Sequence, residues 1–241
     1  ATYHINSFNP EANIVVAPSD HLILKEDEFL SIIQNAYKFV SKHNTLLTLG
    51  IKPSRPETGY GYIQMSEEKL DGVNKVKVFT EKPNLELAKV FFESGEFLWN
   101  SGIFIWNNKT ILSALREYLP EITSRFDRGI DAFGSEKEKA FIDENFPFCP
   151  NISIDYGIME KATNVYVQAA DFGWSDLGTW GSLYEISEKD DEANASLIAN
   201  TIFFDSAENV VTLPAGKLGV IQGLEGYIVA EADGVLLICK K

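Results

Sequence analysis

Two aspartates follow predicted strands, at the positions where α/β enzymes often hold a metal. Asp20 lies in Ala17-Pro-Ser-Asp-His21, directly after an apolar run, and Asp176 lies in Phe172-Gly-Trp-Ser-Asp-Leu-Gly-Thr-Trp180, before a predicted helix. Because parallel strands present ligands at their carboxyl ends, the two carboxylates could converge. Such an oxygen-rich site suits Mg²⁺, with substrate phosphates completing its shell. Capping of the following helix is the alternative role for each aspartate.

A second set of residues could bind a polar ligand. Gly61 lies between two tyrosines in Pro56-Glu-Thr-Gly-Tyr-Gly-Tyr-Ile63, where glycine lets the backbone approach a ligand; a simple bend is the alternative. Glu81 and Lys82 follow the predicted strand 75–80. A carboxylate and an ammonium there could contact a sugar hydroxyl and a phosphate, and a surface ion pair is the alternative.

Polar residues also interrupt apolar segments. Asn100 lies in Trp99-Asn-Ser-Gly102, inside the predicted strand 97–106, and a buried amide costs stability unless it has partners. Asp155 and Tyr156 lie in Ser153-Ile-Asp-Tyr156, at the start of a predicted helix, where capping explains them nearly as well as function does.

Strands and helices alternate along most of the chain. The run Asn13-Ile-Val-Val-Ala17 predicts a strand buried in a parallel sheet, 26–40 has a helical stripe, and 45–51 predicts a second strand. This order indicates one parallel crossover unit and an α/β fold. Asn84 is expected to cap a helix that Gly95 ends. Further strands are expected at 61–64, 75–80, 97–106 and 164–169, and further helices at 84–93, 109–119 and 136–144.

The pattern changes after about Glu192. Five short apolar runs are separated by turn residues, which predicts a small all-β unit. We therefore expect an α/β domain over 1–191 and a β-rich domain over 192–241.

Composition excludes several classes of function. The 241 residues are 45% hydrophobic, and 35 acidic against 21 basic side chains give a net charge of -14, which disfavours nucleic-acid binding. The longest apolar runs are too short to cross a membrane, and no secretory signal is visible. The two cysteines form neither a disulfide framework nor a zinc motif, so we expect a cytoplasmic protein.

Six segments in chain order resemble the motifs of the mannose-1-phosphate guanylyltransferase family, also called GDP-mannose pyrophosphorylases. The resemblance covers essentially the whole chain, including its β-rich end. The segments are Ala17-Pro-Ser-Asp-His21, Glu57-Thr-Gly-Tyr-Gly-Tyr62, Phe79-Thr-Glu-Lys-Pro83, Leu98-Trp-Asn-Ser-Gly102, Ser153-Ile-Asp-Tyr156 with Met159-Glu-Lys161, and Gly173-Trp-Ser-Asp-Leu-Gly178.

The resemblance implies a GT-A-like, Rossmann-like nucleotidyltransferase that joins GTP and mannose 1-phosphate into GDP-mannose and pyrophosphate, with Mg²⁺ as cofactor. It implies that Asp20 and Asp176 hold the metal and act in catalysis together with Lys82. It also implies that the sugar phosphate is bound by Gly61, Glu81, Lys82 and Asn100, with Asp155 and Tyr156 as neighbours.

One part of the family pattern has no counterpart. The family's glycine-rich loop, which cradles the GTP phosphates, is absent, and neither GxGxxG nor GxxxxGK[ST] occurs. We therefore expect an amino-terminally truncated chain that is inactive alone. The alternatives are another sugar-1-phosphate nucleotidyltransferase or a non-catalytic sugar-phosphate-binding module. A homodimer is conceivable, because exposed strand edges of the β unit need covering.

Overall fold

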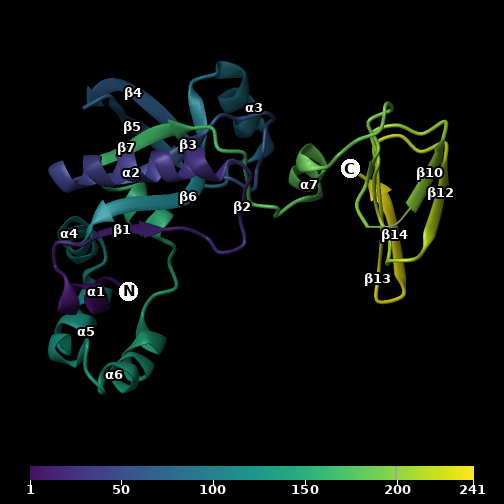
Figure 1. The fold of residues 1–241 in the computed structure, drawn as a ribbon. Coiled ribbons are helices and arrows are strands. Elements are labelled where there is room, and N and C mark those ends of the chain that lie inside the picture. Colours follow the sequence, from purple (N-terminus) through teal and green to yellow (C-terminus); the bar gives the residue numbers. More distant parts are fainter. Residues whose placement is uncertain (199) are drawn as a thin grey trace. The chain divides into compact units, whose positions relative to one another are not determined.

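The structure is a computed structural model that describes residues 1–198 and 200–241 (Figure 1). The chain divides into two units. The first comprises Ala1–Ser19 and Ile23–Trp174, and the second comprises Asp20–Leu22 and Ser175–Lys241. The expected domain boundary at 191/192 lies inside the second unit and stays a prediction. Within the described ranges, no helix is long and apolar enough to cross a membrane.

A six-stranded mixed sheet forms the centre of the first unit. Its order is β1-β6-β3-β7-β5-β4, and the beginning of β4 also pairs with β6. Only β3 and β7 pair in parallel among these strands; the other pairings between them are antiparallel. The expected α/β fold class is confirmed. The strands are β1 (Asn13–Val16), β3 (Leu46–Ile51), β4 (Tyr62–Leu70), β5 (Val73–Thr80), β6 (Phe97–Asn107) and β7 (Val165–Ala170).

The expected surroundings of the first strand were wrong. β1 lies at the edge of the sheet, paired antiparallel with β6, which separates it from β3. β1 and β3 still run in the same direction, since both are antiparallel to β6, but they are not neighbours. An apolar run reports burial and not the direction of the adjacent strand, so the sequence could not reveal that β6 inserts here.

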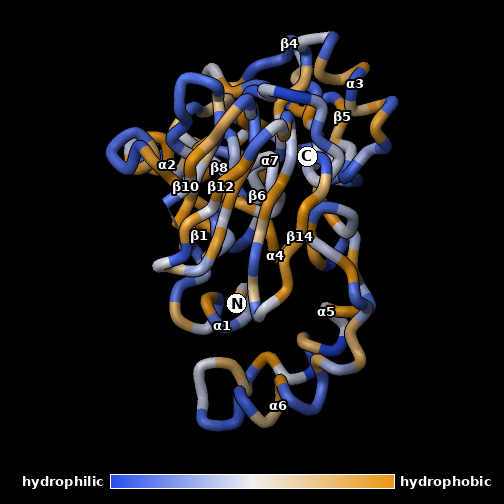
Figure 2. Tube along the Cα trace, turned by 90° about the vertical axis from the view of Figure 1, so that its right-hand side faces the viewer, coloured by the Kyte–Doolittle hydropathy of each residue, from blue (hydrophilic) through white to orange (hydrophobic). Residues whose placement is uncertain are grey.

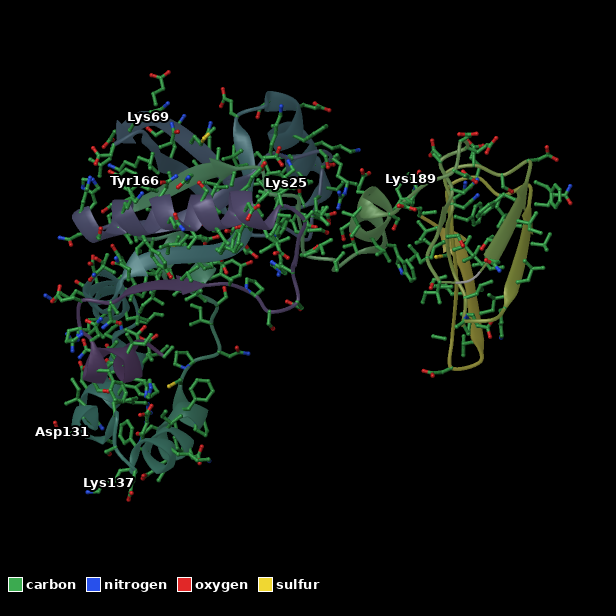
Figure 3. The ribbon with its side chains drawn as sticks, viewed as in Figure 1. Lys25, Lys69, Asp131, Lys137, Tyr166 and Lys189 are labelled. Carbon is green, nitrogen blue, oxygen red and sulfur yellow. The ribbon has the colours of Figure 1, made fainter. Side chains whose placement is uncertain are left out.

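Helices cover both faces of this sheet. The apolar stripe of α2 (Glu26–Lys42) packs on one face, as its periodicity predicts, through Ile33, Ala36, Phe39 and Val40. Tyr166, on the same face, lies beside α2 in Figure 3, with its ring 5.7 Å from that of Phe39. α4 (Asn108–Tyr118) packs on the other face through Ile111 and Ala114. Successive side chains of β3 point to opposite faces of the sheet, so Leu46 packs in the core on one face and Leu47 packs in the core on the other.

The remaining helices complete the first unit. Asn84 accepts a hydrogen bond from Leu87 N and Gly95 ends the helix at φ 69°, which confirms the predicted limits of α3 (Leu85–Ser94). A separate cluster of aromatic side chains, which includes Tyr3 and Phe133, packs together α1 (Thr2–Phe8), α5 (Pro120–Asp127) and α6 (Glu138–Asn145). The 3-10 turns are Ile130–Ala132 and Phe146–Phe148.

The second unit is a parallel β-solenoid rather than a set of hairpins. After α7 (Trp180–Ile186), successive strands alternate between two sheets: β9-β11-β13 pair in parallel in one, and β10-β12 in the other. Among the described strands of this unit, only β13 and β14 form a hairpin, through Asp233 and Gly234 at positive φ. Figure 2 shows hydrophobic residues along β10, β12 and β14. The strands of this unit are β9 (Ala195–Ser196), β10 (Asn200–Phe204), β11 (Val210–Thr212), β12 (Leu218–Gln222), β13 (Tyr227–Ala232) and β14 (Val235–Lys240).

Candidate functional site

Three of the predicted site residues meet where strands β4, β5 and β6 adjoin. Gly61 directly precedes β4, Glu81 directly follows β5, and Asn100 lies within β6. Tyr62 pairs with a residue of β5 on one side and with Trp99 of β6 on the other, so the three positions become neighbours. Asn100 N donates a hydrogen bond to the carbonyl oxygen of Gly61 over 2.8 Å.

Gly61 is a glycine because of space and not because of its backbone angles. A Cβ at this position would lie 2.4 Å from Glu81 Oε2 and 3.2 Å from Asn100 Cβ. Its φ lies outside the left-handed region that favours glycine. The close approach of Glu81 and Asn100 therefore gives this glycine a steric reason, and the approach of a ligand to its backbone stays a prediction.

Asn100 is buried, and both the oxygen and the nitrogen of its side-chain amide form hydrogen bonds. Its Oδ1 accepts from Thr48 Oγ1 at 3.1 Å and from Gly102 N at 3.2 Å, and its Nδ2 donates to Asp155 Oδ1 at 2.9 Å. These partners offset the cost of placing an amide inside an apolar strand. Thr48 was not predicted, because a threonine in an apolar strand looks like an ordinary core residue.

Asp155 reaches this cluster from a short π-helix, Asp155–Met159. Ser153 Oγ accepts from Tyr156 N at 3.4 Å, but the N-cap position of this helix is Ile154, which makes no side-chain cap bond. Burial is the largest influence on Asp155 and raises its pKa, while the hydrogen bond from Asn100 lowers it. Tyr156 is 46% exposed. π-Helical turns are rare and often occur at functional sites.

Glu81 is the most strongly perturbed group of the cluster. Its side chain is only 10% exposed, and burial, followed by the nearby charge of Asp155, raises its pKa to about 7. Lys82 opposes this shift with its Nζ 3.6 Å from Glu81 Oε1. Glu81 Oε2 is buried without a hydrogen-bond partner among the described residues. The surface ion pair considered from sequence is present, but one of its members is buried.

The two predicted metal ligands belong to the second unit. Asp20 precedes β2 (Leu22–Ile23), Asp176 follows β8 (Trp174–Ser175), and these strands pair with each other. Asp176 Oδ1 accepts from Gly178 N at 3.0 Å. Neither aspartate caps the next helix, since α7 is capped by Thr179, and α2 starts after Lys25 with no side-chain cap in the described part of the chain.

The donor set of these aspartates fits Mg²⁺. Asp20 is exposed and Asp176 is half-buried. Among residues 1–198 and 200–241, no group of three or more His, Cys, Asp or Glu side chains could hold a metal. Mg²⁺ is commonly held by one or two carboxylates, with water and substrate phosphates as its other ligands, so two aspartates are an adequate protein share.

Comparisons with known proteins show the family of the chain. A family model described as nucleotidyl transferase matches residues 1–193. Proteins named mannose-1-phosphate guanylyltransferase are 33% identical in Escherichia coli, over 97% of this chain and 51% of the relative, and 35% identical in Sinorhizobium fredii, over 95% and 45%. The chain spans about half the length of the curated relatives it matches.

Solved structures show the same fold. A Thermus thermophilus structure named mannose-1-phosphate geranyltransferase matches with a TM-score of 0.83 at 27% identity, over 99% of this chain and 68% of that one. A Helicobacter pylori structure named mannose-6-phosphate isomerase matches with a TM-score of 0.60 at 26% identity, over 72% and 68%.

Proposed function

The chain belongs to the nucleotidyl transferase family, and we propose that it serves guanylyl transfer from GTP to mannose 1-phosphate. In this reaction a phosphate oxygen of mannose 1-phosphate attacks the α-phosphorus of GTP. The bond from that phosphorus to the oxygen bridging to the β-phosphorus breaks, and pyrophosphate leaves while GDP-mannose forms. The names of the curated relatives support this choice of nucleotide and sugar.

The observation that carries the proposal is the buried polar cluster around Glu81. A sugar offers several hydroxyl donors, and the carboxylates of Glu81 and Asp155 are acceptors on neighbouring elements. Asn100 holds Asp155 in place, while Lys82, whose side chain is 61% exposed, supplies a cation for the phosphate. We assign Tyr156 as a neighbour of this set, in keeping with its place on the same π-helix as Asp155.

In this proposal Asp20 and Asp176 hold Mg²⁺. When bound, the cation would neutralise charge as two polyanions approach, which matters in a protein with a net charge of -14. The contribution of the chain itself is to supply two carboxylates from paired strands, with the turn at Asp176 fixed by its bond from Gly178 N.

The binding of GTP forms a separate part of the proposal. Neither GxGxxG nor GxxxxGK[ST] occurs in the 241 residues, so we propose that this chain alone does not bind GTP productively. A cytoplasmic location and a homodimer stay predictions.

Isothermal titration of the chain with mannose 1-phosphate tests the proposal. We expect binding that weakens at least about tenfold in Glu81→Gln. The exposed Glu93→Gln on α3 serves as the matched control and should bind like the wild type. Equal affinity for glucose 1-phosphate would favour a nucleotidyltransferase of other specificity, and no binding of any sugar phosphate would contradict the proposal.

A further inference from the structure

The turn that carries Glu81 and Lys82 is strained. Lys82 has a φ of 45°, in the left-handed region that non-glycine residues rarely adopt, and it precedes Pro83, which further restricts its backbone. Such a conformation costs free energy and persists only where neighbouring groups hold it. The structure should therefore contain contacts that fix this turn.

Glu160 makes such a contact from a distant part of the chain. Its Oε1 accepts a hydrogen bond from Glu81 N over 3.2 Å, across 79 positions of sequence. Glu81 lies just beyond the end of β5, so this bond engages the first backbone N–H after the strand. A charged acceptor makes this a stronger bond than a neutral one would be.

Glu160 belongs to the same local structure as Asp155. The π-helix ends at Met159, and Glu160 N donates to the carbonyl oxygen of Asp155 at 3.0 Å. The two carboxylates therefore come from one short segment and bind two different elements. Asp155 binds the side chain of Asn100 on β6, and Glu160 binds the backbone directly after β5. This segment ties together the strands on which the candidate site is built.

We propose that Glu160 is a positioning residue that holds the Glu81–Lys82 turn in the conformation that binds a sugar phosphate. The inference rests on the proposed function for its ligand, but the contact between Glu160 and the turn can be measured without one. Glu160 lies within the segment Met159-Glu-Lys161, and no pattern in the sequence assigns it a role or a partner.

The charge of Glu160 gives this role a second signature. The groups that act on Glu81 are Asp155 and Glu160, which raise its pKa, and Lys82, which lowers it. Replacing Glu160 by glutamine keeps an oxygen acceptor and removes the negative charge. The pKa of Glu81 should then fall, and any binding step that follows its ionisation should move to lower pH.

The test compares Glu160→Ala, Glu160→Gln and, as a matched control, the exposed Glu144→Ala on α6. Titration with mannose 1-phosphate should show affinity about tenfold weaker in Glu160→Ala and within about twofold of wild type in Glu160→Gln and the control. The pH profile of binding should shift downward in Glu160→Gln and in Glu160→Ala, which both remove the charge, and should stay unchanged in Glu144→Ala. Equal losses in the alanine and glutamine variants, or no loss in either, would overturn the proposal.

Hydrogen exchange at the Glu81 amide separates this inference from the proposed function. The amide should exchange slowly in the wild type and in Glu160→Gln, and faster in Glu160→Ala, whether or not a sugar phosphate binds. Faster exchange together with no sugar-phosphate binding in any variant would support the contact and contradict the proposed function. Unchanged exchange in Glu160→Ala would overturn the positioning role.

Discussion

The backbone of Gly61 lies against the carboxylate of Glu81, so closely that a methyl group on Gly61 would be 2.4 Å from Glu81 Oε2. This contact joins the start of β4 to the end of β5 and leaves a buried carboxylate oxygen without a partner among the described residues. A group buried in this way costs free energy, and such costs are concentrated at functional sites.

Substitution of Gly61 by alanine should displace the Glu81 side chain. Because the φ of Gly61 suits other residues, we expect the fold to survive while affinity for mannose 1-phosphate falls at least about tenfold. Gly59→Ala in the same loop is the control, since its Cβ would be no closer than 3.4 Å to its nearest neighbour, Glu57 Oε1. Unchanged binding in Gly61→Ala, measured by titration, would separate this glycine from the site.

The raised pKa of Glu81 predicts how stability varies with pH. Between its ordinary pKa of 4.5 and about 7, the folded state keeps a proton that the unfolded state has released. The free energy of unfolding should therefore decrease as pH rises through this window, with a loss on the order of 2 kcal/mol after allowance for solvent screening.

Urea unfolding of wild type and Glu81→Gln at pH 5 and pH 8 measures this effect. The glutamine variant should lose less stability between the two pH values, and the exposed Glu93→Gln should follow the wild type. A Glu81→Gln variant with the full wild-type loss would show that Glu81 is ionised at no cost to folding.

Removal of one of the two proposed metal carboxylates should weaken Mg²⁺ binding without unfolding the turn. Asn at position 176 retains an Oδ1 that can accept from Gly178 N, so the melting temperature of Asp176→Asn should stay close to wild type. Titration with Mg²⁺ should show at least about tenfold weaker binding in Asp176→Asn and in Asp20→Asn. Wild-type affinity in both variants would place the metal elsewhere.

Asn209 should be critical for the second unit. It is buried, its Nδ2 donates to Asn194 Oδ1 and to the Leu224 carbonyl oxygen, and its Oδ1 accepts from Tyr227 N. Asn209→Leu would remove these three bonds and leave Tyr227 N without its acceptor, although Asn194 Oδ1 still accepts from the backbone N of residue 209 and the Leu224 carbonyl oxygen still accepts from Ala207 N. The variant should destabilise this unit by about 1–3 kcal/mol. Chemical denaturation checks this, with the exposed Asp205→Asn as a tolerated control.

Local sequence patterns predicted where helices and strands form better than they predicted which strands lie next to each other in a sheet. The stripe of α2 and the limits of α3 follow from side-chain spacing and capping, which depend on adjacent residues. The edge position of β1 and the parallel pairing of the solenoid depend on strands far away in sequence. Turn residues after Glu192 indicated strand ends correctly. They could not distinguish a hairpin turn from a connection that leads to a strand of the other sheet.

The candidate site divides in the same way. Gly61, Glu81 and Asn100 could be selected because each breaks a local pattern, and the structure brings them together. Thr48 and Glu160 do not break a local sequence pattern, since threonine is common in strands and glutamate is common on protein surfaces. Their contacts with Asn100 and Glu81 arise only from tertiary structure.

The most direct measurement is a crystal structure of the chain with mannose 1-phosphate and Mg²⁺. We predict sugar hydroxyls within hydrogen-bond distance of the carboxylates of Glu81 or Asp155, and the Lys82 ammonium near the phosphate. A sugar phosphate bound away from these residues, with Glu81 Oε2 still unpartnered, would contradict the account.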